Sequence, residues 1–358
     1  MKNPIGTSRP INLEVRRSKR RYRPAALALV AAATTLAAAP VAGASPKPAT
    51  ARSGAAGNRA TVNLAGVTLH IGDQAGSGAQ SLLKAAGLLN KLPFKAQWAD
   101  FTSGPPMLQA EAAGSVDVGA VGDAPPIFAL SGGAPLSLVE ALSTDPTAAA
   151  LLVPKGSSIT SVSQLKGKAI AVAQGSSANY HVLIALQRAG LSVKDVTLDY
   201  LQPAAALAAL SSGRVAAWDV WTPFIEEAEA DGARAIADGT VTGTTYSFEV
   251  ASTAALANPA KAAAIRAYLA DINKAYAWEK THASAWASTW AQATGLSLSI
   301  MDKATKDDIS TPVPISNAVV TSEQGVANAC YTAGLIPSTV NIAAAAYSGY
   351  ANLFQTEK

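Results

Sequence analysis

Cysteine, histidine and charged residues are scarce in this chain. Of its 358 residues, 49% are apolar, 15% charged and 6% aromatic. The single cysteine, Cys330, rules out an intrachain disulfide and any zinc or iron–sulfur site that needs two thiols. His70, His181 and His282 lie far apart in the sequence, so they form no short metal-binding motif. The composition therefore favours a globular protein without a metal or other cofactor.

Positive charge is concentrated at the N-terminus. Eight of the 28 Lys and Arg, but only one of the 24 acidic residues, fall within residues 1–44, so the remainder carries a net charge of −3. A nucleic-acid-binding domain needs a basic face, and the remainder of the sequence has no basic run to supply one. We therefore expect no nucleic acid partner.

The first 44 residues have the pattern of a secretory signal. Basic residues 16–23 precede an apolar run at 25–39 and small residues at 41–45. The apolar run falls short of the ~20 residues that span a bilayer, and the cleavage site has no cysteine to carry a lipid. We expect cleavage after Ala44, export to the periplasm or the extracellular space, and no direct membrane anchor. Residues 45–61, rich in Pro, Ser, Ala and Gly, predict a flexible linker.

Short apolar segments alternate with helical stretches from residue 67 to about residue 235, which is typical of βαβ units. The exported part is too long for one core, so two lobes are expected. Trp278, Trp286 and Trp290 lie at near-helical spacing within 259–293 and predict packing rather than a ligand cage. The expected strands are 67–72, 94–101, 116–121, 169–173, 196–201 and 215–221, and the expected helices between them are 79–89, 106–113, 178–189 and 203–210.

Four strand ends run into a capping residue and a Pro or Gly, at 102–106, 122–126, 174–177 and 221–223. In a parallel sheet these segments share the carboxyl edge, where helix N-termini favour an anion. Pro residues remove N–H donors from the first two segments, whereas 174–178 keeps every N–H and adds the hydroxyls of Ser176 and Ser177. We predict that this segment is the main anion-binding segment and that it binds the anion without Lys or Arg. The alternative is that Ser176 or Ser177 only caps its helix.

Signature motifs of common enzymes are absent. The sequence has no phosphate-binding P-loop, no G-x-S-x-G elbow and no strand-linked G-x-G-x-x-G. A Ser/His/Asp triad assembled in space would leave no such signature, but nothing in the sequence favours one. We expect a protein that is not an enzyme.

Short motifs are spread along the chain, together with Trp218, Trp221 and Pro223. The motifs are 104–108 (GPPML), 114–119 (GSVDVG), 122–128 (GDAPPIF), 165–168 (LKGK), 174–177 (QGSS), 190–191 (GL), 200–204 (YLQPA), 335–337 (LIP) and 340–342 (VNI). By their number and order these motifs resemble the substrate-binding proteins of aliphatic sulfonate ABC importers, which are also related to nitrate and thiamine-precursor binding proteins. The resemblance covers about residues 67–342.

The resemblance implies an α/β, bilobal type II periplasmic-binding-protein fold, with two parallel or mixed-sheet lobes joined by a two-strand hinge. Lobe I would be 62–149 plus 252–358, and lobe II 150–251. The protein would be a monomer that captures an aliphatic sulfonate and delivers it to an ABC permease with its ATPase. Residues 174–178 and the Ala124 N–H would bind the sulfonate, and Trp218 or Trp221 would flank its tail. The expected ligand-binding residues are Gln74, Ser103, Asp123, Ala124, Pro125, Gln174, Gly175, Ser176, Ser177, Trp218, Trp221 and Glu249.

Acidic residues distinguish this chain from the family pattern. Asp73 replaces an aromatic residue, and Glu249 lies near the place where taurine binders carry an acid that resembles an ammonium partner. Together with Asp123, these acids would favour a zwitterion such as taurine. The alternative is that Asp123 is a helix N-cap while Asp73 and Glu249 face solvent.

Other ligands and one other class of protein stay open. The same fold would serve nitrate, a sulfate ester or a thiamine-precursor pyrimidine, although a pyrimidine needs stacking aromatics and the expected cleft offers few beyond Trp218 and Trp221. An enzyme of the pyrimidine-synthesis type would need a catalytic His or Cys in the cleft. His181 is the candidate, and its helical position favours packing.

Overall fold

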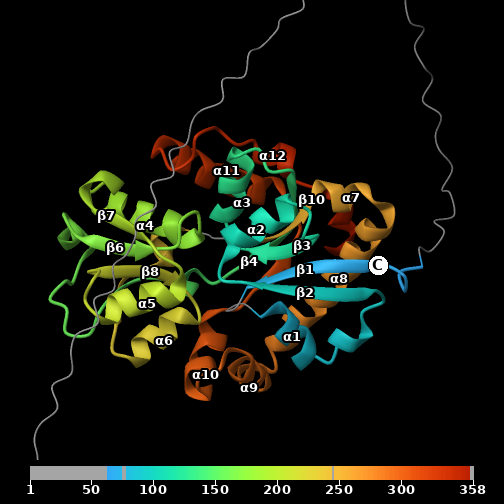
Figure 1. The fold of residues 1–358 in the computed structure, drawn as a ribbon, viewed down its shortest axis with the longest axis horizontal. Coiled ribbons are helices and arrows are strands. Elements are labelled where there is room, and N and C mark those ends of the chain that lie inside the picture. Colours follow the sequence, from blue (N-terminus) through green and yellow to red (C-terminus); the bar gives the residue numbers. More distant parts are fainter. Residues whose placement is uncertain (1–62, 75–77, 244–245, 355–358) are drawn as a thin grey trace, which may run out of the picture. The chain divides into compact units, whose positions relative to one another are not determined.

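The computed structural model describes residues 63–74, 78–243 and 246–354. This part of the chain forms two β-sheets, each with helices packed on both faces (Figure 1). The expected signal peptide and linker, at 1–44 and 45–61, lie outside the described residues. Among the helices described, none is long and apolar enough to cross a membrane.

The larger sheet has six strands: β1 (Thr68–Gln74), β2 (Lys95–Phe101), β3 (Val118–Val121), β4 (Leu136–Ser143), β10 (Tyr246–Ser252) and β11 (Thr311–Val313). Their order is β11-β4-β10-β3-β1-β2. β1 runs parallel to both β2 and β3, whereas the pairs β3–β10, β10–β4 and β4–β11 are antiparallel. The sheet is therefore mixed, as expected.

The smaller sheet has five strands: β5 (Ala149–Val153), β6 (Ala169–Val172), β7 (Thr197–Tyr200), β8 (Ala217–Trp221) and β9 (Arg234–Asp238). Their order is β7-β6-β8-β5-β9. β6 is parallel to β7 and β8, and β5 is antiparallel to β8 and β9. The six strands expected from the sequence are all present with small shifts at their ends, whereas β4, β9, β10 and β11 were not expected.

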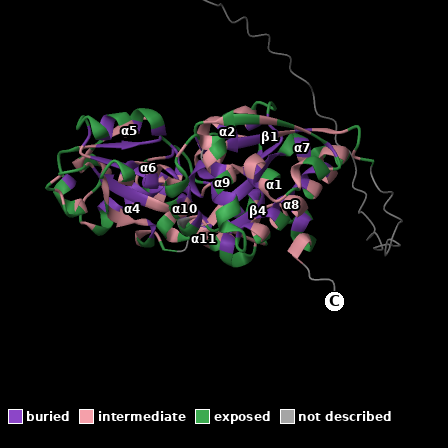
Figure 2. Ribbon diagram, turned by 90° about the horizontal axis from the view of Figure 1, so that it is seen from below, coloured by how far each residue is buried: buried purple, intermediate pink, exposed green. Residues whose placement is uncertain are grey.

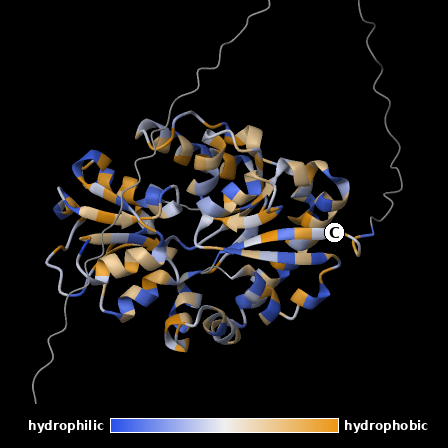
Figure 3. Ribbon diagram, in the orientation of Figure 1, coloured by the Kyte–Doolittle hydropathy of each residue, from blue (hydrophilic) through white to orange (hydrophobic). Residues whose placement is uncertain are grey.

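Helices bury apolar faces against both sheets. On α8 (Pro259–Glu279), the residues Ile265, Tyr268, Leu269 and Ile272 follow helical spacing and are fully buried. Figure 2 shows the strands as mostly buried, and Figure 3 shows helices that carry both apolar and polar residues. The α-helices are α1 (Ala79–Ala85), α2 (Gly104–Ala112), α3 (Ala124–Ser131), α4 (Ser177–Arg188), α5 (Pro203–Ser211), α6 (Phe224–Ala230), α7 (Thr253–Ala257), α8 (Pro259–Glu279), α9 (Ala283–Thr294), α10 (Leu298–Asp307), α11 (Asn317–Thr332) and α12 (Ile342–Ala345).

Each face of a sheet has its own set of helices. In the larger sheet, α1, α8 and α9 cover one face, and α2, α3, α11 and α12 cover the other. In the smaller sheet, α5 and α6 cover one face and α4 the other (Figure 1). The expected helix at 79–89 is shorter, because α1 ends at Ala85 and a separate 3₁₀ turn, η1 (Leu89–Lys91), follows.

The chain passes between the sheets twice. The first crossing leads from β4 through the 3₁₀ turn η2 (Pro146–Ala148) into β5, and the second leads from β9 through η5 (Gly239–Val241) toward β10. Strand β10 pairs with β3 and β4 in the larger sheet. The return to the first lobe thus precedes Tyr246, whereas the sequence analysis put it at residue 252. That boundary was misplaced because the apolar strand gives no sign of which sheet it joins.

The two crossings pack directly against each other. A Cβ placed on Gly239 would lie 1.9 Å from the Pro146 carbonyl oxygen, so a side chain at 239 would push the crossings apart. Asp145 and Asp238 precede the two turns and accept hydrogen bonds from Thr147 and Thr240 in the same way. The two crossings thus correspond to the two-strand connection expected between the lobes.

Two buried carboxyl groups face each other across strands of the larger sheet. Glu140 on β4 and Glu249 on β10 are direct partners in the pairing register. Asn273 donates to Glu140 at 2.9 Å, and Tyr268 donates to Glu249 at 3.3 Å. Burial raises the pKa of each carboxyl to about 8, and the Glu140 charge adds to the increase at Glu249. Both groups are therefore largely protonated at neutral pH.

We expect the free energy of unfolding to fall as the pH rises from 5 to 8. The folded state keeps protons on Glu140 and Glu249 that the unfolded chain loses near pH 4.5, so their contribution is complete below pH 4.5 and is lost as pH approaches 8. Each proton gives a slope of up to about 1.4 kcal/mol per pH unit. Urea unfolding at a series of pH values in this range measures the slope. The Glu249→Gln variant should have a flatter dependence of the free energy of unfolding on pH. Asp100→Asn, on exposed β2, should leave it unchanged, and a slope unaffected by Glu249→Gln would contradict the assignment.

Candidate functional site

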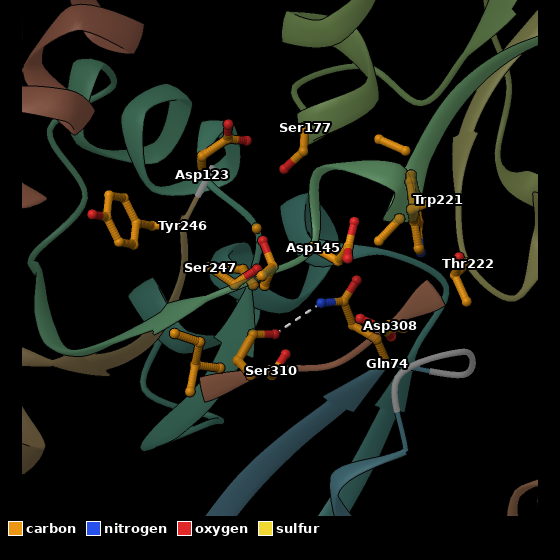
Figure 4. A pocket seen from close by; sticks show the side chains of 18 of the residues that line it. Gln74, Asp123, Asp145, Ser177, Trp221, Thr222, Tyr246, Ser247, Asp308 and Ser310 are labelled. Carbon is orange, nitrogen blue, oxygen red and sulfur yellow. Dashed lines mark hydrogen bonds between the residues drawn. The ribbon is translucent and has the colours of Figure 1, made fainter. Parts of the chain in front are cut away.

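A cavity of about 190 Å³ lies where strand ends of the two sheets meet. Gln74 ends β1, Asp123 follows β3, and Trp221 ends β8, and all three line the cavity (Figure 4). Ser176 and Ser177 reach it from the start of α4. The carboxyl ends of the parallel strands thus converge on one space, as the sequence predicted from their capping residues.

Half of the predicted ligand-binding residues line this cavity. They are Gln74, Asp123, Pro125, Ser176, Ser177 and Trp221. The other six have positions outside its lining, and these are Ser103, Ala124, Gln174, Gly175, Trp218 and Glu249.

Local packing explains why several predicted residues lie outside the cavity. Trp218 is 1% exposed and packs in the core near Phe224, because it points to the opposite face of β8 from the cavity. Ser103 is buried, and its hydroxyl donates to Gln202 at 2.9 Å. The Ala124 N–H donates to the Asp123 carboxylate at 2.7 Å, so that donor is already engaged.

The segment before α4 uses part of its donors internally. The Gly175 N–H donates to the Asn179 side chain at 3.1 Å, and the Ser176 N–H and hydroxyl both donate to the Ala173 carbonyl. Ser176 also accepts from the Asn179 N–H, which confirms the capping role considered for it. The Asn179 and Tyr180 N–H groups donate to the Ser176 carbonyl, so the first-turn N–H groups that remain for a ligand are those of Ser177 and Ala178.

Ser177 brings the two lobes into contact beside the cavity. Its hydroxyl donates to the buried Asp123 carboxylate, which lies at the start of α3. A Cβ on Gly122 would lie 2.0 Å from the Ser177 Oγ, so only glycine at 122 lets Ser177 approach this closely. Asp123 caps α3, as the alternative interpretation expected, and it lines the cavity as well. Burial raises its pKa, while Ser177, Ala124 and His181 act in the opposite direction.

His181 lies one turn further along α4 and forms a buried ion pair with Asp219. Its Nδ1 lies 2.7 Å from the Asp219 Oδ2, and its Nε2 lies 2.9 Å from the Asp238 carbonyl oxygen. Burial alone would lower the pKa of His181, but Asp219 and the Asp238 carbonyl outweigh it and raise the pKa to about 9. Both ring nitrogens therefore donate, and an imidazolium lies beside the cavity.

Asp73 and Glu249 do not face solvent, contrary to one of the expectations. Asp73 is buried and accepts from the N–H groups of Ala79 and Gln80 at the start of α1. Glu249 is buried in the larger sheet. Neither lines the cavity, so they do not form the acidic environment that the sequence suggested around a ligand.

Other acids line the cavity instead. Asp145 lies in the first crossing, Glu279 ends α8, and Asp308 follows α10. Burial raises the pKa of Glu279 to about 8 and that of Asp308 to about 6, and each is raised further by a neighbouring acid of the group. The sequence analysis missed all three, because they lie outside the parallel strand ends and carry no local motif.

Six aromatic residues line the cavity, more than the sequence suggested. Trp286 and Trp290 stack with ring centroids 5.0 Å apart and are buried, so the expected packing role is confirmed, but both also reach the cavity. The Trp290 indole N–H is buried without a hydrogen-bond partner. Helical spacing indicated that these side chains pack, but not that the packed face ends at a cavity. The six are Tyr180, Trp221, Tyr246, Tyr276, Trp286 and Trp290.

Positive side chains and metal ligands are lacking around the cavity. No Lys or Arg belongs to its lining within the described residues. The same part of the chain contains no group of three or more His, Cys, Asp or Glu residues suited to a metal ion. An anion in the cavity would therefore be held by helix N–H groups and hydroxyls, while the His181 imidazolium, whose two N–H groups are engaged, adds only its positive charge.

Contacts at the rim also join the lobes. Thr102 and Ser103 donate to the Gln202 side chain at 2.9 Å each, across from β2 to the start of α5. Lys303 on α10 forms an ion pair with Glu229 on α6. Together with Ser177 and Asp123, these contacts close the two lobes on the cavity.

Replacing Asp219 should reverse the pKa shift of His181. In Asp219→Asn, burial remains without the compensating charge, so we expect the His181 pKa to fall from about 9 to below 6.5. The ion pair stabilises the fold fully below pH 6.5 and loses this contribution as pH rises through about 9. NMR titration of ¹⁵N-labelled histidine measures the pKa. Asp231→Asn, an exposed acid of the same lobe, serves as the control, and a His181 that still titrates near 9 in Asp219→Asn would refute the pairing.

A family model and a curated relative match this chain over most of its described part. The family described as NMT1/THI5 like matches residues 103–282. An aliphatic sulfonates-binding protein of Escherichia coli strain K12 is 35% identical over 278 residues, which cover 76% of this chain and 86% of that protein.

Solved structures agree with these matches. The alkanesulfonate-binding protein SsuA from Xanthomonas axonopodis pv. citri, bound to MOPS, has a TM-score of 0.75 and 34% identity, covering 78% of this chain and 98% of that one. The periplasmic aliphatic sulphonate binding protein SsuA from Escherichia coli has a TM-score of 0.70 and 34% identity, with 78% and 92% covered. The bilobal fold expected from the sequence is thereby confirmed, and the chain belongs to the aliphatic sulfonate-binding proteins of the NMT1/THI5-like family.

Proposed function

We propose that this protein is an exported solute-binding protein, which captures an aliphatic sulfonate and delivers it to an ABC importer. The observation that carries the proposal is the first turn of α4, which opens with Ser177 into a cavity enclosed by both lobes. A sulfonate is a permanent anion with three acceptor oxygens, so it suits N–H and hydroxyl donors. These donors bind it without the lysine or arginine that would hold it too tightly for release.

Two parts of the cavity suit two parts of an alkanesulfonate. The α4 end offers the first-turn N–H groups of Ser177 and Ala178, and the nearby His181 imidazolium adds positive charge. Trp221, Trp286 and Leu82 add apolar surface that would cover an aliphatic tail. Both lobes contribute to the cavity, so closing the lobes removes its hydrogen-bond donors from water. Closure would therefore be favourable only when a bound anion accepts hydrogen bonds from these donors.

A binding role suits the geometry better than catalysis. His181, the candidate general base, has both ring nitrogens engaged by Asp219 and Asp238. Cys330 is buried outside the cavity lining, and burial raises the pKa of its thiol to about 12. A histidine base needs an unprotonated ring nitrogen and a cysteine nucleophile needs a thiolate, and neither group is in that form. Transport energy would come from a separate ATPase, because the sequence has no nucleotide motif.

The aromatic lining favours a thiamine-precursor pyrimidine as the second candidate ligand. Tyr180, Tyr246 and Tyr276 add to the three Trp residues around the cavity, and stacked rings are what a flat heterocycle needs. A pyrimidine would use these faces and the acidic groups rather than the α4 donors. Its inclusion in a ligand panel therefore separates the two candidates.

Sulfonates should raise the thermal stability of the purified protein. A ligand present at 100 times its Kd adds about 2.7 kcal/mol to the free energy of unfolding. The panel comprises ethanesulfonate, longer alkanesulfonates, taurine, sulfate, nitrate, a sulfate ester and hydroxymethyl-pyrimidine. Ser177→Asp should abolish the sulfonate effect by placing a negative charge at the α4 donors, whereas Ser163→Asp, on an exposed serine of the same lobe, should leave it intact. Stabilisation by the pyrimidine alone would exclude the proposed ligand class.

A further inference from the structure

We propose that this protein selects alkanesulfonates by the length of the alkyl tail, and that Leu82, Trp286 and Trp290 set the longest tail that fits. These three residues are called the tail wall. The inference rests on the proposed function and narrows its substrate class to sulfonates with short alkyl tails. The tail wall comes from α1 and α9, which cover the larger sheet, whereas the anion donors come from α4 on the smaller sheet.

The tail wall is the part of the hydrophobic core that reaches the cavity. All three side chains line the cavity, yet each is at most 3% exposed. They belong to the core that α1, α8 and α9 form on one face of the larger sheet. The two indole rings are nearly parallel, at an angle of 11°. A ligand tail that reaches this side of the cavity therefore meets closely packed side chains rather than solvent.

The tail wall has little room to withdraw. A Cβ placed on Gly78 would lie 3.3 Å from the Trp286 Cη2 and 3.5 Å from the Trp290 Cδ1, so the backbone before α1 packs directly against both indoles. Leu83, the neighbour of Leu82 on α1, is fully buried. Forcing extra carbon atoms into such a packed core displaces side chains and costs free energy. The wall therefore acts as a fixed stop for a tail.

The volume of the cavity limits the tail to a few carbons. A cavity of about 150 Å³ holds the six carbons of benzene. At the same packing, a cavity of about 190 Å³ holds about eight non-hydrogen atoms. The sulfonate group takes four of these as one sulfur and three oxygens, which leaves about four for the tail. Butane-1-sulfonate is thus close to the longest ligand that the closed cavity encloses.

Closure of the lobes converts tail length into affinity. The Ser177 and Ala178 N–H groups would fix the sulfonate on one lobe, while the wall stands on the other (Figure 1). Each methylene enclosed between them should tighten binding about fourfold, the equivalent of about 0.8 kcal/mol. A longer tail would meet the wall before the lobes close. It would then keep Thr102 from reaching Gln202, its partner at 2.9 Å across the rim.

A neighbouring cavity does not offer a longer alkyl tail an alternative. This second cavity, of about 280 Å³, extends toward α11, where Ser322 and the buried Glu323 line it. An alkyl chain placed there would take polar groups out of water without giving them hydrogen bonds, which costs free energy. The residues that the two cavities share are Asp123, Tyr180, Thr242 and Tyr246.

A series of unbranched 1-alkanesulfonates, from methane- to octanesulfonate, tests the limit. Isothermal titration calorimetry of the purified full chain at pH 7 gives the Kd of each. We expect the Kd to fall about fourfold per carbon to an optimum at about three to five carbons. Beyond the optimum, the Kd should rise about tenfold within two further carbons, because they no longer fit. A Kd that keeps falling through octane-1-sulfonate, an optimum outside this range, or no dependence on tail length would overturn the inference.

Variants assign the limit to the tail wall. Leu82→Ala removes three carbons and leaves a void that joins the cavity, so the optimum should move to tails longer by about one to three carbons. Leu83→Ala is the matched control, because Leu83 lies on the same helix and is equally buried but outside the lining. It should keep the wild-type optimum. If Leu82→Ala does not fold, Leu82→Val, which removes one carbon, should move the optimum by about one carbon. An optimum that stays in place in the Leu82 variants, or that moves equally in Leu83→Ala, would contradict the assignment.

Failure of this inference is distinguishable from failure of the proposed function. Binding of alkanesulfonates without an optimal tail length rejects the tail wall but keeps the sulfonate-binding function. Absence of binding by every member of the series rejects the proposed function and the tail wall together.

Discussion

The cavity must hold charge without any lysine or arginine in its described lining, and the arrangement of the site follows from this constraint. Positive potential in the described lining comes from the first turn of α4 and from the His181 imidazolium beside it. Carboxyl groups line the same cavity, with Asp123 beside Ser177 and with Glu279 and Asp308 elsewhere in the lining. An anion would therefore be bound by positioned N–H dipoles rather than by a free cationic side chain.

His181 links the anion donors to the hinge. Its ring connects α4 to Asp219 on β8 and to the Asp238 carbonyl, from which the second crossing begins. Asp145, in the first crossing, lines the cavity directly, and the two crossings meet where Gly239 contacts Pro146. The buried contacts of His181 thus connect the helix that carries the binding donors to the start of the second crossing.

The sequence predicted the parts of the site that depend on parallel strand ends. Caps after strands placed Gln74, Asp123, Ser176, Ser177 and Trp221 together, because such ends share one edge of a sheet. The direction of individual side chains was harder to predict from the sequence. Trp218 and Trp221 lie on one strand but point to different sides of it, and only Trp221 reaches the cavity. Glu279 and Asp308 were missed because antiparallel pairing and helix packing bring them to the site from the C-terminal part of the chain. Strand pairing also placed β10 in the first lobe, which no local pattern indicates.

The central claim is that the sulfonate group binds at the first turn of α4. A crystal structure of the protein with an alkanesulfonate tests this most directly. The account predicts a sulfonate oxygen within hydrogen-bond distance of the Ser177 N–H, with the tail directed toward Trp221 and Trp286. A sulfonate group bound beside Glu279 and Asp308, or on the aromatic faces away from α4, would contradict it.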